Sequence, residues 1–66
     1  MPKVSDEYKS EIRQRLVVAA SRVMAEHGPS GMTTRAIQEE AGVSAGTIYN
    51  YFPSMSQLFE AVGEHL

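Results

Sequence analysis

The fold of this chain is decided by the stretch from Thr33 to Phe52, TTRAIQEEAGVSAGTIYNYF. Thr33 and Ser44 each precede a short run of helix-forming residues, and a side-chain oxygen at such a position caps the first turn of a helix. Gly42 lies between the two runs and suits the left-handed residue with which many helices end. Two short helices joined by a three- or four-residue turn that contains glycine form a helix-turn-helix. The stretch therefore predicts this motif.

The residues before this stretch have the periodicity of one long helix. At 100° per residue the apolar side chains gather on one face, and Ser5 or Asp6 can cap its start. Gly28 and Pro29 should end the helix, because glycine accepts a left-handed conformation and proline cannot continue a helix. The predicted buried face consists of Ile12, Leu16, Ala19, Ala20 and Val23, with Val17 and Met24 on its borders.

A further helix begins after Pro53, where Ser54 and Gln57 fit a capping box. No alternating strand pattern competes with the helical periodicity. The sequence thus predicts one all-α domain over residues 1–66, a small helical bundle of three helices plus the start of a fourth, which contains a helix-turn-helix and is homeodomain-like. The expected helices span about residues 6–27, 34–41, 45–52 and from about 55 onward.

The composition is that of a small globular domain. A hydrophobic content of 42% allows a core, although 66 residues lie near the lower limit for folding alone. The chain has no cysteine, so neither a disulfide nor a cysteine-based zinc site can support it. Its first residues are too polar for a signal peptide and no stretch approaches membrane-spanning length, so we expect a cytoplasmic protein. No catalytic triad or phosphate-binding glycine loop occurs, and we expect no enzymatic activity, cofactor or metal.

Charge is distributed unevenly along the chain. Six Lys and Arg against eight Asp and Glu give a net charge of −2, whereas DNA-binding domains are usually basic. No charged residue occurs from Val43 to Leu58, and the C-terminal end carries Glu60 and Glu64. Most of the cations lie in the first third of the chain: Lys3, Lys9, Arg13, Arg15 and Arg22. We therefore expect modest affinity for nucleic acid from one such domain.

The second helix of the predicted motif has an apolar side and an uncharged polar side. If Ile48 and Phe52 point into the core, Gly46 and Asn50 point almost opposite. An uncharged helix surface suits close approach to base edges, and the amide of Asn50 can pair with a base such as adenine. Tyr49 flanks this surface and can pack on a thymine methyl group or reach a phosphate. These residues predict a helix that reads the major groove of DNA.

Motifs at fixed spacings run through nearly the whole chain, from about Arg13 to Val62. They are RQRLVVAASRVMAEHG at 13–28, Thr33-Thr34, Ile37, AGVS at 41–44, GTIY at 46–49 and YFPS at 51–54. In this order they resemble the N-terminal domain of TetR-family transcriptional regulators. Each fragment is weak alone, but the ordered set is specific.

The resemblance implies sequence-specific binding of double-stranded DNA by the head of a transcription regulator. Such regulators are typically homodimeric repressors whose recognition helices read the half-sites of a palindromic operator. A larger C-terminal domain, absent from this chain, would hold the dimer and bind a small-molecule effector. Carried over by position, the base-facing residues would be Ala45, Gly46, Tyr49 and Asn50. The residues facing the DNA backbone would be Thr33, Thr34, Ser44, Thr47 and Tyr51.

Three positions depart from the family pattern. Met55 stands where the family usually has a lysine that contacts phosphate. Gln38 replaces a small alanine that packs against the recognition helix, and Ala45 replaces a residue that is often polar or basic. The departures predict weaker binding by a single head rather than a different fold.

Three alternatives remain open at this point. The chain could be a protein-interaction module that docks a partner through an uncharged surface of Tyr49, Tyr51 and Met55. Arg15 and Arg22 could equally form a solvated face or contact phosphates, and Tyr51 could equally be an ordinary half-buried tyrosine. Salt dependence separates the two functions, because DNA binding weakens steeply as salt rises.

Overall fold

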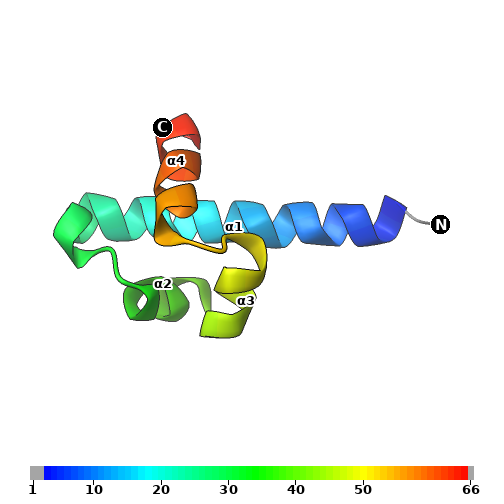
Figure 1. The fold of residues 1–66 in the computed structure, drawn as a ribbon, viewed down its shortest axis with the longest axis horizontal. Coiled ribbons are helices and arrows are strands. Elements are labelled where there is room, and N and C mark those ends of the chain that lie inside the picture. The colour runs from blue at the N-terminus through cyan, green and yellow to red at the C-terminus, as the bar shows by residue number, and fades with distance from the viewer. Residues whose placement is uncertain (1–2, 66) are drawn as a thin grey trace.

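The computed structural model describes residues 3–65, with side chains from residue 9 onward. Over these residues the chain forms four α-helices and a short 3₁₀ helix: α1 (Lys3–His27), η1 (Pro29–Gly31), α2 (Thr34–Ala41), α3 (Ala45–Tyr51) and α4 (Met55–His65). In Figure 1, α2 and α3 lie on one side of α1, and α4 crosses α1 with its C-terminal end directed away from them. The prediction of an all-α bundle with a helix-turn-helix is confirmed.

Helix α1 begins earlier than predicted. It starts at Lys3, so Ser5 and Asp6 lie inside the helix and the predicted cap at these residues is wrong. The sequence contains no glycine or proline between Lys3 and His27, and nothing interrupts the helical backbone over these residues. The N-terminal part of α1 consequently extends past the other helices on the side of α3 (Figure 1).

Gly28 ends α1, with φ 76° and ψ 177°. This region of backbone conformation is essentially restricted to glycine. Its ψ differs from the left-handed helical value that was predicted, because the chain extends directly into the turn of η1 instead of closing a left-handed cap. The Gly28 N–H still donates to the carbonyl oxygen of Met24 at 2.8 Å, which satisfies one of the last carbonyls of α1.

The core lies where all four α-helices meet. Leu16 of α1, Ile37 of α2, Ile48 of α3, and Leu58 and Val62 of α4 are fully buried. Burying a side chain of this size contributes about 1.5–3 kcal/mol. The rest of the core is Ile12, Val17, Ala19, Ala20, Val23, Met32, Phe52 and Ala61. The predicted face of α1 is confirmed, but Val17, expected at its border, is buried, and Met32 of the loop was not anticipated.

Side-chain hydrogen bonds cap the N-terminal ends of α2 and α3, the two short helices of the motif. Thr33 Oγ1 accepts a hydrogen bond from the Ala36 N–H at 3.1 Å, and Ser44 Oγ accepts one from the Thr47 N–H at 3.2 Å. Between the helices Gly42 has φ 73° and ψ 35°, the left-handed conformation that the sequence predicts. Helix α3 ends at Tyr51, one residue before the predicted end, because the residue before a proline is pushed out of the helical conformation.

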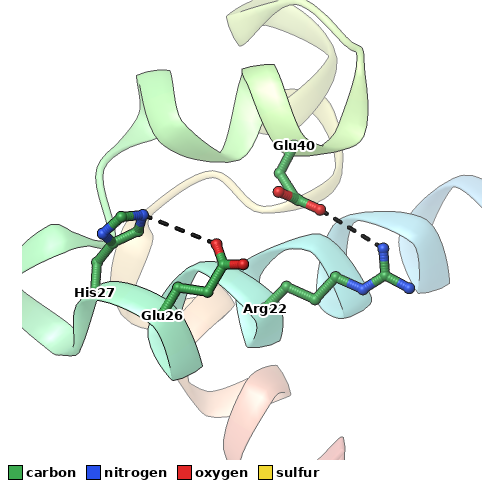
Figure 2. Close-up of polar contacts among 4 residues, drawn as sticks. All are labelled: Arg22, Glu26, His27 and Glu40. Atoms are coloured by element: carbon green, nitrogen blue, oxygen red, sulfur yellow. Dashed lines mark ion pairs between the residues drawn. The ribbon is translucent and has the colours of Figure 1, made fainter.

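An ion pair joins α1 to α2. Arg22 Nη1 lies 3.6 Å from Glu40 Oε2 (Figure 2), with the Arg22 side chain 68% exposed. An exposed pair of this kind stabilises by about 0–1 kcal/mol. Figure 2 also shows His27 Nε2 at 3.9 Å from Glu26 Oε1, a contact that is an ion pair only when the imidazole is protonated. Of the two alternatives for Arg22, the pairing with Glu40 favours a surface role.

None of the helices in residues 3–65 combines the length and apolar composition needed to cross a membrane.

Candidate nucleic-acid interface

Helix α3 is oriented as its residue pattern predicts. Ile48 and Phe52 are buried, at 0% and 3% exposure, and hold the helix on the core. Gly46, Tyr49 and Asn50 are exposed on the outer side, with Tyr49 at 45% the most exposed large apolar side chain of the described residues. The outer side of α3 is therefore an uncharged polar surface that no other described element covers.

The Tyr49 hydroxyl is bound to the first residue of α2. Tyr49 Oη and Thr34 Oγ1 lie 3.0 Å apart, and Thr34 Oγ1 also lies 3.8 Å from Met55 Sδ with geometry that allows it to donate. The three residues come from α3, α2 and α4, so the contact joins three helices at the surface. Sequence reasoning assigned Tyr49 and Thr34 to the site but could not place them in contact, since they are 15 residues apart and on different elements.

Three further hydroxyls lie at the starts of α2 and α3. Ser44 Oγ and Thr47 Oγ1 are 3.1 Å apart, and this mutual hydrogen bond uses only one of their two protons. Thr33 Oγ1 accepts from Ala36, so its own proton also remains. These exposed or half-buried groups can donate to an outside acceptor such as a phosphate oxygen.

A basic groove runs between α1 and α3. It has a volume of about 530 Å³ and is lined by Lys9, Ser10, Arg13, Asn50 and Tyr51. Neither Lys9 nor Arg13 forms an ion pair with another side chain of residues 9–65. Lys9, Ser10 and Arg13 were not predicted as site residues from the sequence, although the i, i+4 spacing of the two cations places them on one side of α1.

Arg13 is held at the edge of this groove by an aromatic ring. Its guanidinium carbon lies 5.1 Å from the centroid of the Phe52 ring, a cation–π contact that joins α1 to the end of α3. On its other side Arg13 borders a second hollow, which Glu60 and Glu64 of α4 also line. Arg13 therefore lies between the uncharged outer side of α3 and the acidic end of α4.

The nine residues assigned from the sequence lie on α3 and at the starts of α2 and α3. Gly46, Tyr49 and Asn50 of the base-facing group are exposed, and Ala45 is half-buried. Of the backbone-facing group, Thr33 and Ser44 are exposed, whereas Thr34, Thr47 and Tyr51 are half-buried. The Tyr49 hydroxyl contacts Thr34 of α2, whereas Asn50 borders the groove toward α1, so the two side chains face different neighbouring helices.

Among the described residues no group of three or more His, Cys, Asp or Glu side chains could hold a metal ion.

Comparison with known proteins bears on this arrangement. Residues 16–62 match the family described as bacterial regulatory proteins, tetR family. The nucleoid occlusion factor SlmA of Haemophilus influenzae is 39% identical over 66 residues, which cover 98% of this chain and 30% of that protein. The HTH-type transcriptional repressor AcnR of Corynebacterium diphtheriae is 40% identical over 62 residues, 94% of this chain and 33% of that protein.

The chain is also similar to a second HTH-type transcriptional repressor. The HTH-type transcriptional repressor Rv1474c of Mycobacterium tuberculosis is 34% identical over 62 residues, again 94% of this chain and 33% of that protein. This chain thus spans about a third of the length of the curated relatives it matches. No solved structure matches it significantly. With its helix-turn-helix and a match over residues 16–62, the chain belongs to the tetR family of bacterial regulatory proteins.

Proposed function

We propose that this chain is the sequence-specific DNA-binding head of a transcriptional repressor, which reads an operator half-site with α3 in the major groove. The observation that carries the proposal is the orientation of α3: Ile48 and Phe52 are buried, and the exposed side is uncharged. Family membership and two relatives named as HTH-type transcriptional repressors support it. They favour it over a protein-interaction module.

The base-facing role falls to Ala45, Gly46, Tyr49 and Asn50. A Cβ added at Gly46 would meet only Ser44 Oγ, at 3.8 Å, so packing within the protein does not require a glycine there. Close approach of the α3 backbone to base edges would require it. The Asn50 amide can form two hydrogen bonds with N6 and N7 of adenine, and Ala45 can contribute a methyl contact.

The DNA backbone is contacted on both sides of α3. Thr33 and one of the pair Ser44 and Thr47 can donate a hydroxyl proton to a phosphate, and Thr34 can donate its backbone N–H at the start of α2. Tyr51 lies in the basic groove, where Lys9 and Arg13 supply the positive charge that α3 lacks. This placement explains how a domain with net charge −2 can attract a phosphate backbone, since the cations border the reading helix.

We place this head in a larger regulator that acts in the cytoplasm. In that protein two copies would form a homodimer, so that two α3 helices meet the half-sites of a palindrome about one helical turn apart. A C-terminal domain outside this chain would hold the dimer and bind a small-molecule effector. A single head would then bind one half-site weakly, and joining two heads would raise the affinity through effective concentration.

The test is selection of duplexes from a random pool, with the head alone and with two heads joined by a coiled coil. The dimerised head should enrich a palindrome. The affinity of the dimerised head should fall as salt rises, with a log–log slope of about −3.6 or steeper, if Lys9 and Arg13 each neutralise a phosphate in each head. No enrichment, or an affinity that salt does not change, would contradict the proposal and favour the protein-interaction module.

A further inference from the structure

The side chains of Tyr49, Thr34 and Met55 share two hydroxyl protons, but all three of their polar atoms can accept a hydrogen bond. The Tyr49 hydroxyl has one proton, the Thr34 hydroxyl has one, and the Met55 thioether has none and can only accept. Thr34 Oγ1 lies 3.0 Å from Tyr49 Oη and 3.8 Å from Met55 Sδ. The single proton of Thr34 can therefore serve Met55 or Tyr49, but not both.

Only one arrangement forms both hydrogen bonds. If Thr34 donates to Met55, then Tyr49 donates to Thr34, and both contacts have a proton. If Thr34 donates to Tyr49 instead, the contact with Met55 has no proton at all. The first arrangement is therefore favoured, although the preference is modest because a thioether sulfur is a weak acceptor.

The direction of these two hydrogen bonds determines whether the Tyr49 and Thr34 hydroxyls can donate to DNA or only accept from it. With its proton directed to Thr34, Tyr49 Oη presents only lone pairs on its exposed side, and Thr34 Oγ1 does the same. A phosphate oxygen is also only an acceptor, so neither hydroxyl suits it. The exocyclic amino groups of adenine N6 and cytosine N4 are donors in the major groove, whereas guanine O6 and thymine O4 are acceptors.

We propose that Met55, through Thr34, sets Tyr49 as a hydrogen-bond acceptor, so that Tyr49 selects an adenine or cytosine amino group over a guanine or thymine carbonyl. The proposal rests on the DNA-binding function proposed above. Met55 is a positioning residue in this scheme, and Tyr49 is the residue that touches the base. Thr34 then contacts a phosphate only through its backbone N–H, while its hydroxyl orients Tyr49.

The experiment measures relative affinities of the dimerised head for duplexes that differ at single positions of the selected half-site. Tyr49→Phe identifies the position that the hydroxyl reads, because the variant should lose preference there and nowhere else. At that position the dimerised head without substitutions should favour A or C over G or T by roughly two- to tenfold, which is the range of affinity that one neutral hydrogen bond gives.

Two substitutions at Met55 test the polarity. Met55→Leu conserves volume and removes the sulfur acceptor, so the preference should shrink to less than about half, as Thr34 becomes free to donate to Tyr49. Met55→Lys replaces the acceptor with a donor, which should turn the Thr34 proton toward Tyr49 and the Tyr49 proton outward. That variant should prefer G or T at the same position, whatever its added charge does to overall affinity.

Met24→Leu is the matched control. Met24 is half-buried against the core on α1, and the same chemical change there does not touch Thr34 or Tyr49. Its base preference should equal that of the natural protein, and circular dichroism should show that all variants are equally helical.

The outcomes separate this proposal from the one on which it rests. If Met55→Leu keeps the full preference that Tyr49→Phe removes, or if Met55→Lys only binds more tightly without changing base preference, the polarity is wrong and DNA binding stands. If Tyr49→Phe changes no position, the hydroxyl reads no base and the inference is overturned. If the natural protein selects no duplex, both proposals fail.

Discussion

The Arg13 guanidinium lies 5.1 Å from the centre of the Phe52 ring, and this contact ties the basic side of α1 to the buried end of the reading helix. Phe52 is buried in the core at 3% exposure, so packing holds its ring in place beneath the exposed Arg13 guanidinium. Arg13 is thereby kept beside Asn50 and Tyr51 in the groove. The same aromatic residue anchors α3 and positions a cation next to it.

Replacing Arg13 with glutamine should weaken DNA binding and reduce its salt dependence. Loss of one phosphate contact per head should lower the log–log salt slope by about 0.9 per head, and loss of the cation–π contact should cost about 0.5–1 kcal/mol of folding stability. Fluorescence anisotropy at several salt concentrations measures the slope. Arg15→Gln is the control, because Arg15 is exposed on the same helix but borders a different hollow, with Arg22 and Glu40. Equal effects of the two substitutions would contradict a local role for Arg13.

Replacing Glu64 with glutamine should strengthen DNA binding slightly at low salt. Glu64 borders the hollow next to Arg13 and lowers the positive potential there. Removing its charge should raise affinity by about twofold at low ionic strength, the order of an interaction between two exposed charges, and the gain should disappear at high salt. Glu26→Gln, at the far end of α1 beside His27, removes the same charge away from the groove and should have no effect. A gain that persists at high salt would exclude an electrostatic cause.

Replacing Gly46 with alanine should separate folding from DNA binding. The added Cβ fits against Ser44 Oγ at 3.8 Å, and a glycine in a helix is less stable than alanine by up to about 1 kcal/mol. The variant should therefore melt at the same temperature or higher, while operator affinity falls by about tenfold or more if one good base contact is lost. Gly63→Ala in α4, where a Cβ meets nothing within 4 Å, should likewise melt at the same temperature as the unsubstituted chain or higher, and it should bind DNA normally. Normal binding by Gly46→Ala would show that α3 does not approach DNA at this residue.

Two alanine substitutions on α3 should have opposite consequences. Ile48→Ala removes a fully buried side chain and should destabilise the domain by about 2–5 kcal/mol, which is enough to unfold many domains of this size. Asn50→Ala removes an exposed amide and should leave the melting temperature nearly unchanged while it weakens operator binding. Thermal denaturation and anisotropy on both variants make the comparison. If Asn50→Ala unfolds the domain, Asn50 is structural.

The sequence was sufficient to predict features that depend on local chemistry. Thr33 and Ser44 cap their helices, Gly42 adopts the left-handed turn, and the spacing of Ile48 and Phe52 orients α3. Each of these follows from residues within one or two helical turns of each other. The start of α1 was misplaced because Ser5 is acceptable both as a cap and inside a helix, and no breaker near it decides between the two.

Features that depend on how helices pack against one another could not be predicted. The contact of Thr34 with Tyr49 and Met55 requires the relative placement of α2, α3 and α4, which periodicity within each helix does not determine. The groove that brings Lys9 and Arg13 to Asn50 likewise depends on the angle between α1 and α3. Helix periodicity indicates which side of each helix is buried, but not which exposed residues of different helices become neighbours.

The separation of cations from the uncharged reading surface has a kinetic consequence. Long-range attraction acts on Lys9 and Arg13 of α1, whereas the side chains that would discriminate bases carry no charge. We expect ionic strength to change mainly how fast the head reaches DNA, and substitutions on α3 to change mainly how long it stays. Stopped-flow measurements would resolve these two rates, and selectivity would then appear in the residence time at the operator.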